Sequence, residues 1–161
     1  MASNTSDAER DDKNLWYHLV WLDKNMNHFS TQRRIKLLKE IDPDMKTFII
    51  PEECIDYIER ENCRKSSTAI IFIISGALSE QVIPKIQDYT CVFAIFIFCT
   101  NSAAYERLNF EKLRAVHIDM DELMDDIEMC INKFNATTDF SIFLDQKPII
   151  SGKILIRINP S

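Results

Sequence analysis

Two runs of apolar residues dominate the pattern of the chain. The first covers residues 69–74 (AIIFII) and the second covers residues 92–98 (VFAIFIF), and small polar residues follow each run. Runs that are apolar at every position are typical of strands covered on both faces in a parallel sheet. The pattern therefore predicts two central strands. It also places any site at their carboxyl ends, where open parallel sheets bind ligands.

Shorter apolar segments alternate with helical patterns around these two runs. The other predicted strands cover residues 17–22, 47–50 and 115–118. The predicted helices begin at Ser30 or Thr31, at Pro51, near Leu78, at Ser102 and after Asp119. Five β-α repeats imply right-handed crossovers and a three-layer sandwich. The expected fold is α/β, with a five-stranded parallel sheet in the flavodoxin-like order 2-1-3-4-5.

Local signals support three of these helices. Pro51 suits a first helical turn, because the N–H that proline lacks has no partner there. Ser102 is expected to cap a helix that reaches about Phe110. Asp119 with Glu122 three residues later resembles a capping box at the start of the last helix.

The two ends of the chain fit the repeat less well. Residues 1–14 are polar and acidic, so we expect a flexible lead-in before a domain at 15–134. Residues 135–161 contain two segments, 140–144 and 149–158, that we expect to be extended. They would form an extended tail, or the start of a following region.

Composition excludes several classes of function. The chain has 161 residues, 46% of them hydrophobic, and a net charge of −6. One domain with a real core is expected, and a general binder of nucleic acid or of anionic membranes is not. Only two glycines occur, so Gly-rich phosphate loops are absent. No apolar run approaches the roughly 18 residues needed to span a bilayer.

The five cysteines point to a reducing compartment. None forms a Cys-x-x-Cys pair, and only three histidines are present, so no structural zinc site is expected. Several of the cysteines occupy apolar positions, as buried free thiols do. With no secretory signal visible, we expect a cytoplasmic protein.

Polar residues follow four of the predicted strands. In the order 2-1-3-4-5, the ends of strands one, three, four and five meet at one crevice. Hydroxyl groups and backbone N–H groups there would suit a small ligand. The candidate site residues are Asp23, Asn25, Ser75, Gly76, Thr100, Asn101 and Asp119.

The five-repeat layout resembles a receiver domain, the phosphoryl-accepting module of two-component signalling. That resemblance implies an acidic pair after strand one and a phosphoacceptor aspartate at the end of strand three. It also implies a threonine or serine at the end of strand four and a lysine at the end of strand five. Here Asp23 stands alone, Ser75 replaces the phosphoacceptor, and Thr100 fits. Asp119 or His117 stands where lysine is expected. Too few carboxylates remain to hold magnesium, and no aspartyl-phosphate can form, so we expect no catalytic residue, metal or cofactor.

Three further segments carry a second resemblance. They are LVWLDKN at 19–25, IISGALSEQVIPKI at 73–86 and IFIFCTN at 95–101, with Thr31-Gln32 opening the first helix. Taken in this order they resemble a domain near the N-terminus of many invertebrate multidomain proteins, and the likeness covers about residues 19–131. Those proteins often carry an arginine-type ADP-ribosyltransferase domain or tetratricopeptide repeats. The resemblance implies a regulatory or recruiting module and brings no catalytic residues.

The favoured hypothesis is thus a non-catalytic pseudo-receiver domain that binds a protein partner or an adjacent domain. The acidic run 119–128 and a basic surface on the first helix also permit a homodimer. One alternative is a small-ligand or nucleotide-binding module that uses the crevice. Another is an enzyme acting on a nucleotide cofactor, which would need Asp23, Glu80 and His117 to surround one pocket.

Overall fold

The computed structural model describes residues 16–64 and 68–144, with side chains for 17–64 and 68–136. The chain divides into two compact units, one of residues 16–128 and one of residues 1–15 with 129–161. The first unit contains the sheet and every candidate site residue, so it is the unit that positions the site.

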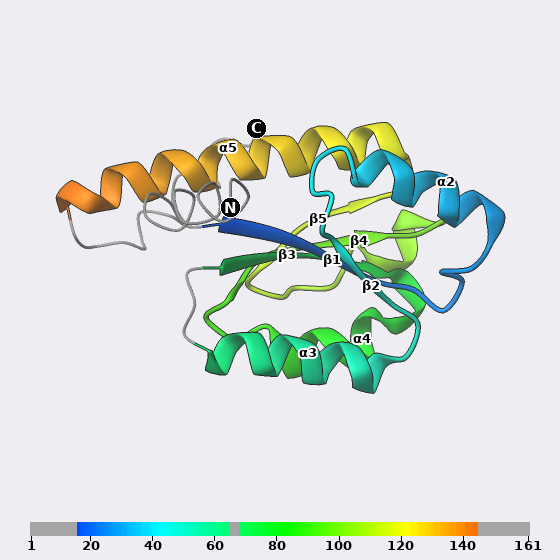
Figure 1. The fold of residues 1–161 in the computed structure, drawn as a ribbon. Coiled ribbons are helices and arrows are strands. Elements are labelled where there is room, and N and C mark those ends of the chain that lie inside the picture. The colour runs from blue at the N-terminus through cyan, green and yellow to red at the C-terminus, as the bar shows by residue number, and fades with distance from the viewer. Residues whose placement is uncertain (1–15, 65–67, 145–161) are drawn as a thin grey trace, which may run out of the picture. The chain divides into compact units, whose positions relative to one another are not determined.

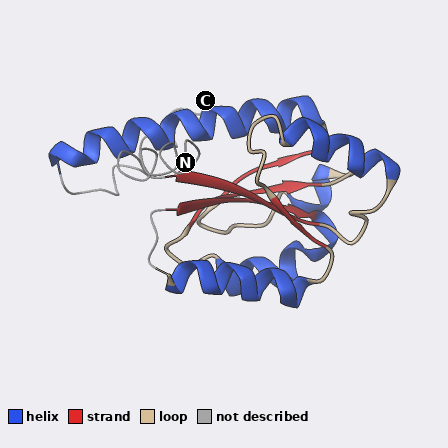
Figure 2. Cartoon of the chain, in the orientation of Figure 1, coloured by secondary structure: helices blue, strands red, loops and turns tan. Residues whose placement is uncertain are grey.

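Five parallel strands form one sheet in the order β2-β1-β3-β4-β5 (Figure 1), which confirms the predicted fold. The strands are β1 (Trp16–Leu22), β2 (Lys46–Phe48), β3 (Thr68–Ser75), β4 (Val92–Phe98) and β5 (Leu113–His117). The helices are α2 (Phe29–Leu38), α3 (Pro51–Cys63), α4 (Gly76–Ile86), the 3-10 helix η1 (Ser102–Tyr105) and α5 (Met120–Leu144). Helices cover both faces of the sheet (Figure 2).

The two apolar runs are the central strands β3 and β4, paired in parallel with Phe72 opposite Ile95. Apart from the half-buried Ala69 and Phe93, their side chains are buried, and alternate residues face opposite layers. Residues Ile70, Phe72 and Ile74 belong to the core cluster shared with α3 and α4. The continuous apolar pattern is therefore explained by cover on both sides.

The start of α2 differs from the prediction. The cap residue is His28, whose Nδ1 accepts a hydrogen bond from the backbone N–H of Ser30 at 3.4 Å. Ser30 and Thr31 lie inside the helix, and Thr31 is buried. Thr31 thus packs on the buried face of α2, and a residue in that position cannot also be the cap residue. Pro51 does occupy the first turn of α3, as predicted.

The predicted helix from Ser102 to about Phe110 is wrong, because only the four residues of η1 are helical. The Asn101 side chain accepts a hydrogen bond from Ala103 N at 3.2 Å and caps this short turn. Farther along, Leu108 and Phe110 both pack against the core cluster. Their spacing of two residues cannot face one side of a helix, so burying both requires an irregular chain.

Helix α5 continues to Leu144, so the expectation of an extended segment at 140–144 is wrong. The other expected extended segment, 149–158, lies outside the described residues, as does the rest of the tail from 145. The lead-in at 1–14 also lies outside them.

Asp42 joins β1 to the connection between α2 and β2. Its Oδ2 accepts a hydrogen bond from Leu19 N at 2.8 Å and lies 3.1 Å from His18 Nδ1, while its Oδ1 accepts one from Asp44 N at 3.0 Å. Burial alone would raise the pKa of this carboxyl, but the hydrogen bonds outweigh it and hold the pKa below its ordinary value. The charged form of Asp42 is therefore the one that stabilises the fold.

We predict that Asp42→Asn lowers the free energy of unfolding at neutral pH by about 1–3 kcal/mol, the usual loss for a charged hydrogen-bond acceptor. A depressed folded-state pKa contributes stability above the unfolded value and loses it as the pH falls through the folded value. Urea denaturation should therefore show the difference between wild type and variant shrinking as the solution is acidified below the ordinary pKa. A constant difference at all pH values would contradict this assignment.

Candidate functional site

The carboxyl ends of four strands lie at the same end of the sheet, where the sequence predicted a crevice. In the strand register Leu22 is opposite Ile74, Ser75 is opposite Phe98, and Phe98 is opposite His117. The residues that follow β1, β3, β4 and β5 are therefore neighbours at this end, as the order 2-1-3-4-5 requires.

After β1, the polar groups are engaged in a local turn. The Asp23 backbone N–H donates to Phe48 O at 3.0 Å, and Asp23 Oδ1 accepts from Asn25 N at 2.8 Å. The backbone carbonyl of Asn25 accepts from His28 N at 2.9 Å. Asp23 thus shapes the connection to α2, as aspartate commonly does in turns.

After β3, the chain passes directly into α4 through Ser75 and Gly76. Ser75 is the cap residue of α4, but its side chain makes no capping hydrogen bond. Gly76 is buried, and a Cβ added there would lie 2.5 Å from Cε2 and Cζ of the Tyr105 ring. Only glycine leaves room for that ring, so Tyr105 from η1 packs directly against the first turn of α4.

The candidate residues after β4 and β5 are exposed, and Asn101 and Asp119 cap the elements that follow. Thr100 and Asn101 are exposed, and Asn101 caps η1. Asp119 Oδ2 accepts from Glu122 N at 3.3 Å, which matches the capping bond predicted for the start of α5. Among the seven candidate residues, the hydrogen bonds given by the structure join only Asp23 and Asn25.

His117 is held by α5 instead of facing the crevice. Its Nε2 lies 2.6 Å from Asp126 Oδ2, and its Nδ1 lies 3.8 Å from Glu122 Oε1. Its ring stacks on Phe96, with centroids 6.3 Å apart. These contacts fasten the first turns of α5 to β5 and to the sheet.

The three residues that the enzyme hypothesis needs, Asp23, Glu80 and His117, do not surround one pocket. Asp23 and His117 end strands β1 and β5, which are three strand spacings apart, about 14 Å. Glu80 lies exposed on α4. Neither acid can exchange a proton with His117 over the hydrogen-bond distances that general acid-base catalysis uses.

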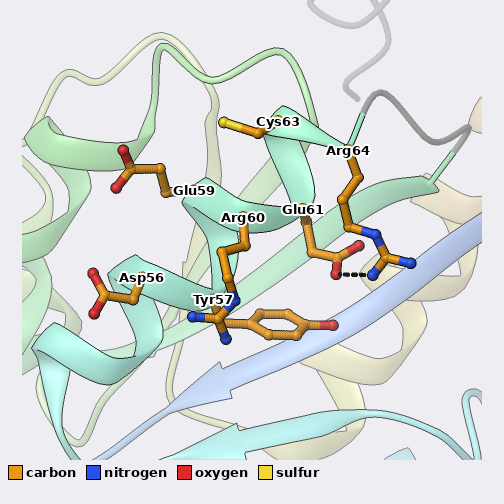
Figure 3. Close-up of a pocket in the computed structure, with 7 residues that line it drawn as sticks. All are labelled: Asp56, Tyr57, Glu59, Arg60, Glu61, Cys63 and Arg64. Carbon is orange, nitrogen blue, oxygen red and sulfur yellow. Dashed lines mark hydrogen bonds and ion pairs between the residues drawn. The ribbon is translucent and has the colours of Figure 1, made fainter.

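A surface hollow of about 620 Å³ lies elsewhere, along α3 (Figure 3). Its lining comes from this one helix: Asp56, Tyr57, Glu59, Arg60, Glu61, Cys63 and Arg64. Arg64 Nη1 donates to Glu61 Oε2 at 2.9 Å, so opposite charges there partly neutralise each other. Burial, followed by the nearby Glu61 charge, raises the pKa of Tyr57 to about 12, so its hydroxyl stays protonated.

The sequence analysis missed Tyr105 altogether. The available signal was Gly76 itself, one of only two glycines, at the junction of a strand and a helix. The structure gives Gly76 no positive φ angle, so its requirement is space for a neighbour.

No family model, curated protein or solved structure matches the chain. Among the residues that the structure describes, no helix combines the length and the apolar composition needed to span a bilayer. The same part of the chain has no group of three or more His, Cys, Asp or Glu side chains placed to hold a metal ion.

We predict that Gly76→Ala lowers the free energy of unfolding by about 1–3 kcal/mol, because the new methyl group displaces the Tyr105 ring. In a Tyr105→Ala background the same change should be neutral or slightly stabilising, since alanine favours a helix more than glycine does. Urea denaturation of the four proteins in this cycle measures the coupling. Equal costs of Gly76→Ala in both backgrounds would show that the ring does not fill this space.

We also predict that one cysteine dominates reaction with an aromatic disulfide reagent at mildly alkaline pH. Cys63 is the exposed cysteine, whereas burial raises the pKa of Cys54 to about 12 and that of Cys91 to about 11. Thiolate is the reactive form, so these two should react slowly until the protein unfolds. Cys63→Ser should remove the fast phase, and a fast phase that survives this change would contradict the exposure assigned here.

Proposed function

We propose that residues 16–128 form a pseudo-receiver domain: a non-catalytic module that regulates or recruits by binding a protein partner or an adjacent domain. The parallel sheet in the order 2-1-3-4-5 supports the receiver-like part of this proposal. The non-catalytic part rests on how the residues at the strand ends are used.

The observation that carries the proposal is the contact between Tyr105 and Gly76. In folds of this type the helix N-terminus that follows a central strand is the natural seat for an anionic group. Here the Tyr105 ring packs against Gly76, the first residue of that helix. The Tyr105 ring at this position supports a packing role for the start of α4 and not a role in binding an anion.

The carboxylates around the crevice support the same conclusion. Asp23 stabilises the turn after β1, and Asp119 caps α5. Ser75 stands where a receiver would have its phosphoacceptor aspartate. A carboxylate nucleophile and a cluster of oxygen ligands are both needed for phosphoryl transfer through magnesium.

The resemblance to the invertebrate multidomain proteins adds context. A module of that kind would act beside another domain, and it would work through its surface. The five cysteines are free, which suits a reducing compartment, so we place its action in the cytoplasm.

A panel of thermal-shift measurements tests this function. We predict no change in the melting temperature with purine nucleotides, nicotinamide dinucleotides, inorganic phosphate, or magnesium with beryllofluoride. A ligand present at 100 times its dissociation constant would stabilise the fold by about 2.7 kcal/mol, which corresponds to a shift of several degrees.

Ser75→Ala is the matched control, because its hydroxyl makes no capping bond and its loss should leave the melting temperature unchanged. A saturable shift in the wild type that this substitution abolishes would overturn the proposal. It would favour a ligand-binding module at the strand ends.

A further inference from the structure

Helix α2 has an outward face that no element of the described chain covers. Its inward face buries Thr31, Ile35 and Leu38. On the outward side, Phe29 is 74% exposed and Leu37 is 40% exposed. A partner that covered these two side chains would remove apolar surface from water, which favours association.

This apolar surface is also basic. Phe29, Arg33 and Leu37 are spaced by four residues, so they follow one line along the helix. Lys36 is exposed beside them, and α2 contains no acidic residue. The outward face of α2 therefore combines apolar anchors with positive charge.

The start of α5 has the opposite charge. Residues 120–128 include five acids and no lysine or arginine. Two of them, Glu122 and Asp126, face His117. The other three, Asp121, Asp125 and Glu128, are exposed and make no ion pair within the described residues.

Both surfaces belong to the same layer of the sandwich (Figure 1). The Arg34 guanidinium of α2 lies 5.1 Å from the centre of the Phe98 ring on β4. On the same side of β4, Phe96 stacks on His117, which pairs with Asp126 of α5. A basic apolar face and an acidic face are thus presented together on one side of the molecule.

We propose that this side binds a second copy of the chain, with α2 of each subunit against residues 120–128 of the other. This inference rests on the proposed role as an interaction module and names its partner. A two-fold axis lets one pair of complementary surfaces form twice. Charge complementarity sets the orientation of the helices, and burial of Phe29 and Leu37 supplies the apolar gain.

A second copy fits better than a different partner because both halves of the complementary pair are in this chain. Each half would otherwise need its own partner, one acidic and one basic. The two surfaces also lie on one side, so they can engage one twofold-related copy at the same time.

Charge reversal followed by light scattering and sedimentation tests the homodimer. The wild type should show the mass of a dimer at micromolar concentration, and added salt should weaken it because exposed charges are screened. An α2 variant, Arg33→Glu with Lys36→Glu, should raise the dissociation constant by about 100-fold. An α5 variant, Asp125→Lys with Glu128→Lys, should do the same.

Mixing the α2 variant with the α5 variant gives the decisive result. The mixture restores complementary charge at both helix pairs, because an acidic α2 meets a basic α5 and a basic α2 meets an acidic α5. A heterodimer should therefore form where neither variant dimerises alone. Carrying all four substitutions on one chain should restore the homodimer. Asp56→Lys with Glu59→Lys on α3 is the matched control, because it changes the net charge as the α5 variant does but lies on the opposite side of the sheet.

Three outcomes would overturn the homodimer: a monomeric wild type, a dimer unaffected by either reversal, or variants that fail to rescue each other while circular dichroism shows them folded. None of these would bear on the proposed function, which the ligand panel tests separately. A saturable ligand-induced thermal shift that Ser75→Ala abolishes would in turn refute that function without altering the measured mass.

Discussion

Burial of β3 and β4 on both faces is the constraint on which the rest of the structure depends. Strands with apolar side chains at every position must be covered by helices on both sides. The cover leaves no room for polar chemistry within the sheet, because an unpaired polar group buried there would cost several kcal/mol. Polar function is therefore confined to the strand ends and to the outer faces of the helices.

The same constraint explains what could be predicted. The two uninterrupted runs at 69–74 and 92–98 determined the central strands, and alternation with helical patterns determined the order of the sheet. The candidate residues at the strand ends follow from that order, since neighbouring strands must end together. Asp119 as a cap was also predictable, because the relevant hydrogen bond is local.

The parts that could not be predicted depend on contacts between distant segments. Nothing near Ser102 indicates that Leu108 and Phe110 are drawn into the core and end the helix early. The approach of Tyr105 to Gly76 joins two separate connections, so neither local sequence reveals it. The sequence therefore predicted polar residues at the strand ends but could not show that the Tyr105 ring packs against Gly76.

These contacts change the meaning of the polar residues at the crevice. Taken separately, Asp23, Ser75 and Thr100 resemble the remains of a phosphoryl-transfer site. In the structure Asp23 stabilises a turn, Ser75 is the cap residue of α4, and the Tyr105 ring packs against the neighbouring Gly76. What remains available for function is the outer surface, where α2 and the start of α5 carry complementary charge.

The central claim is that the Tyr105 ring packs against Gly76 at the start of α4 and leaves no open crevice there. Nuclear Overhauser contacts between the Tyr105 ring protons and the Gly76 α-protons measure this most directly. The account predicts strong contacts that persist when phosphate and magnesium are added. A missing contact, or one that disappears as either ion is titrated, would show an open crevice and contradict the account.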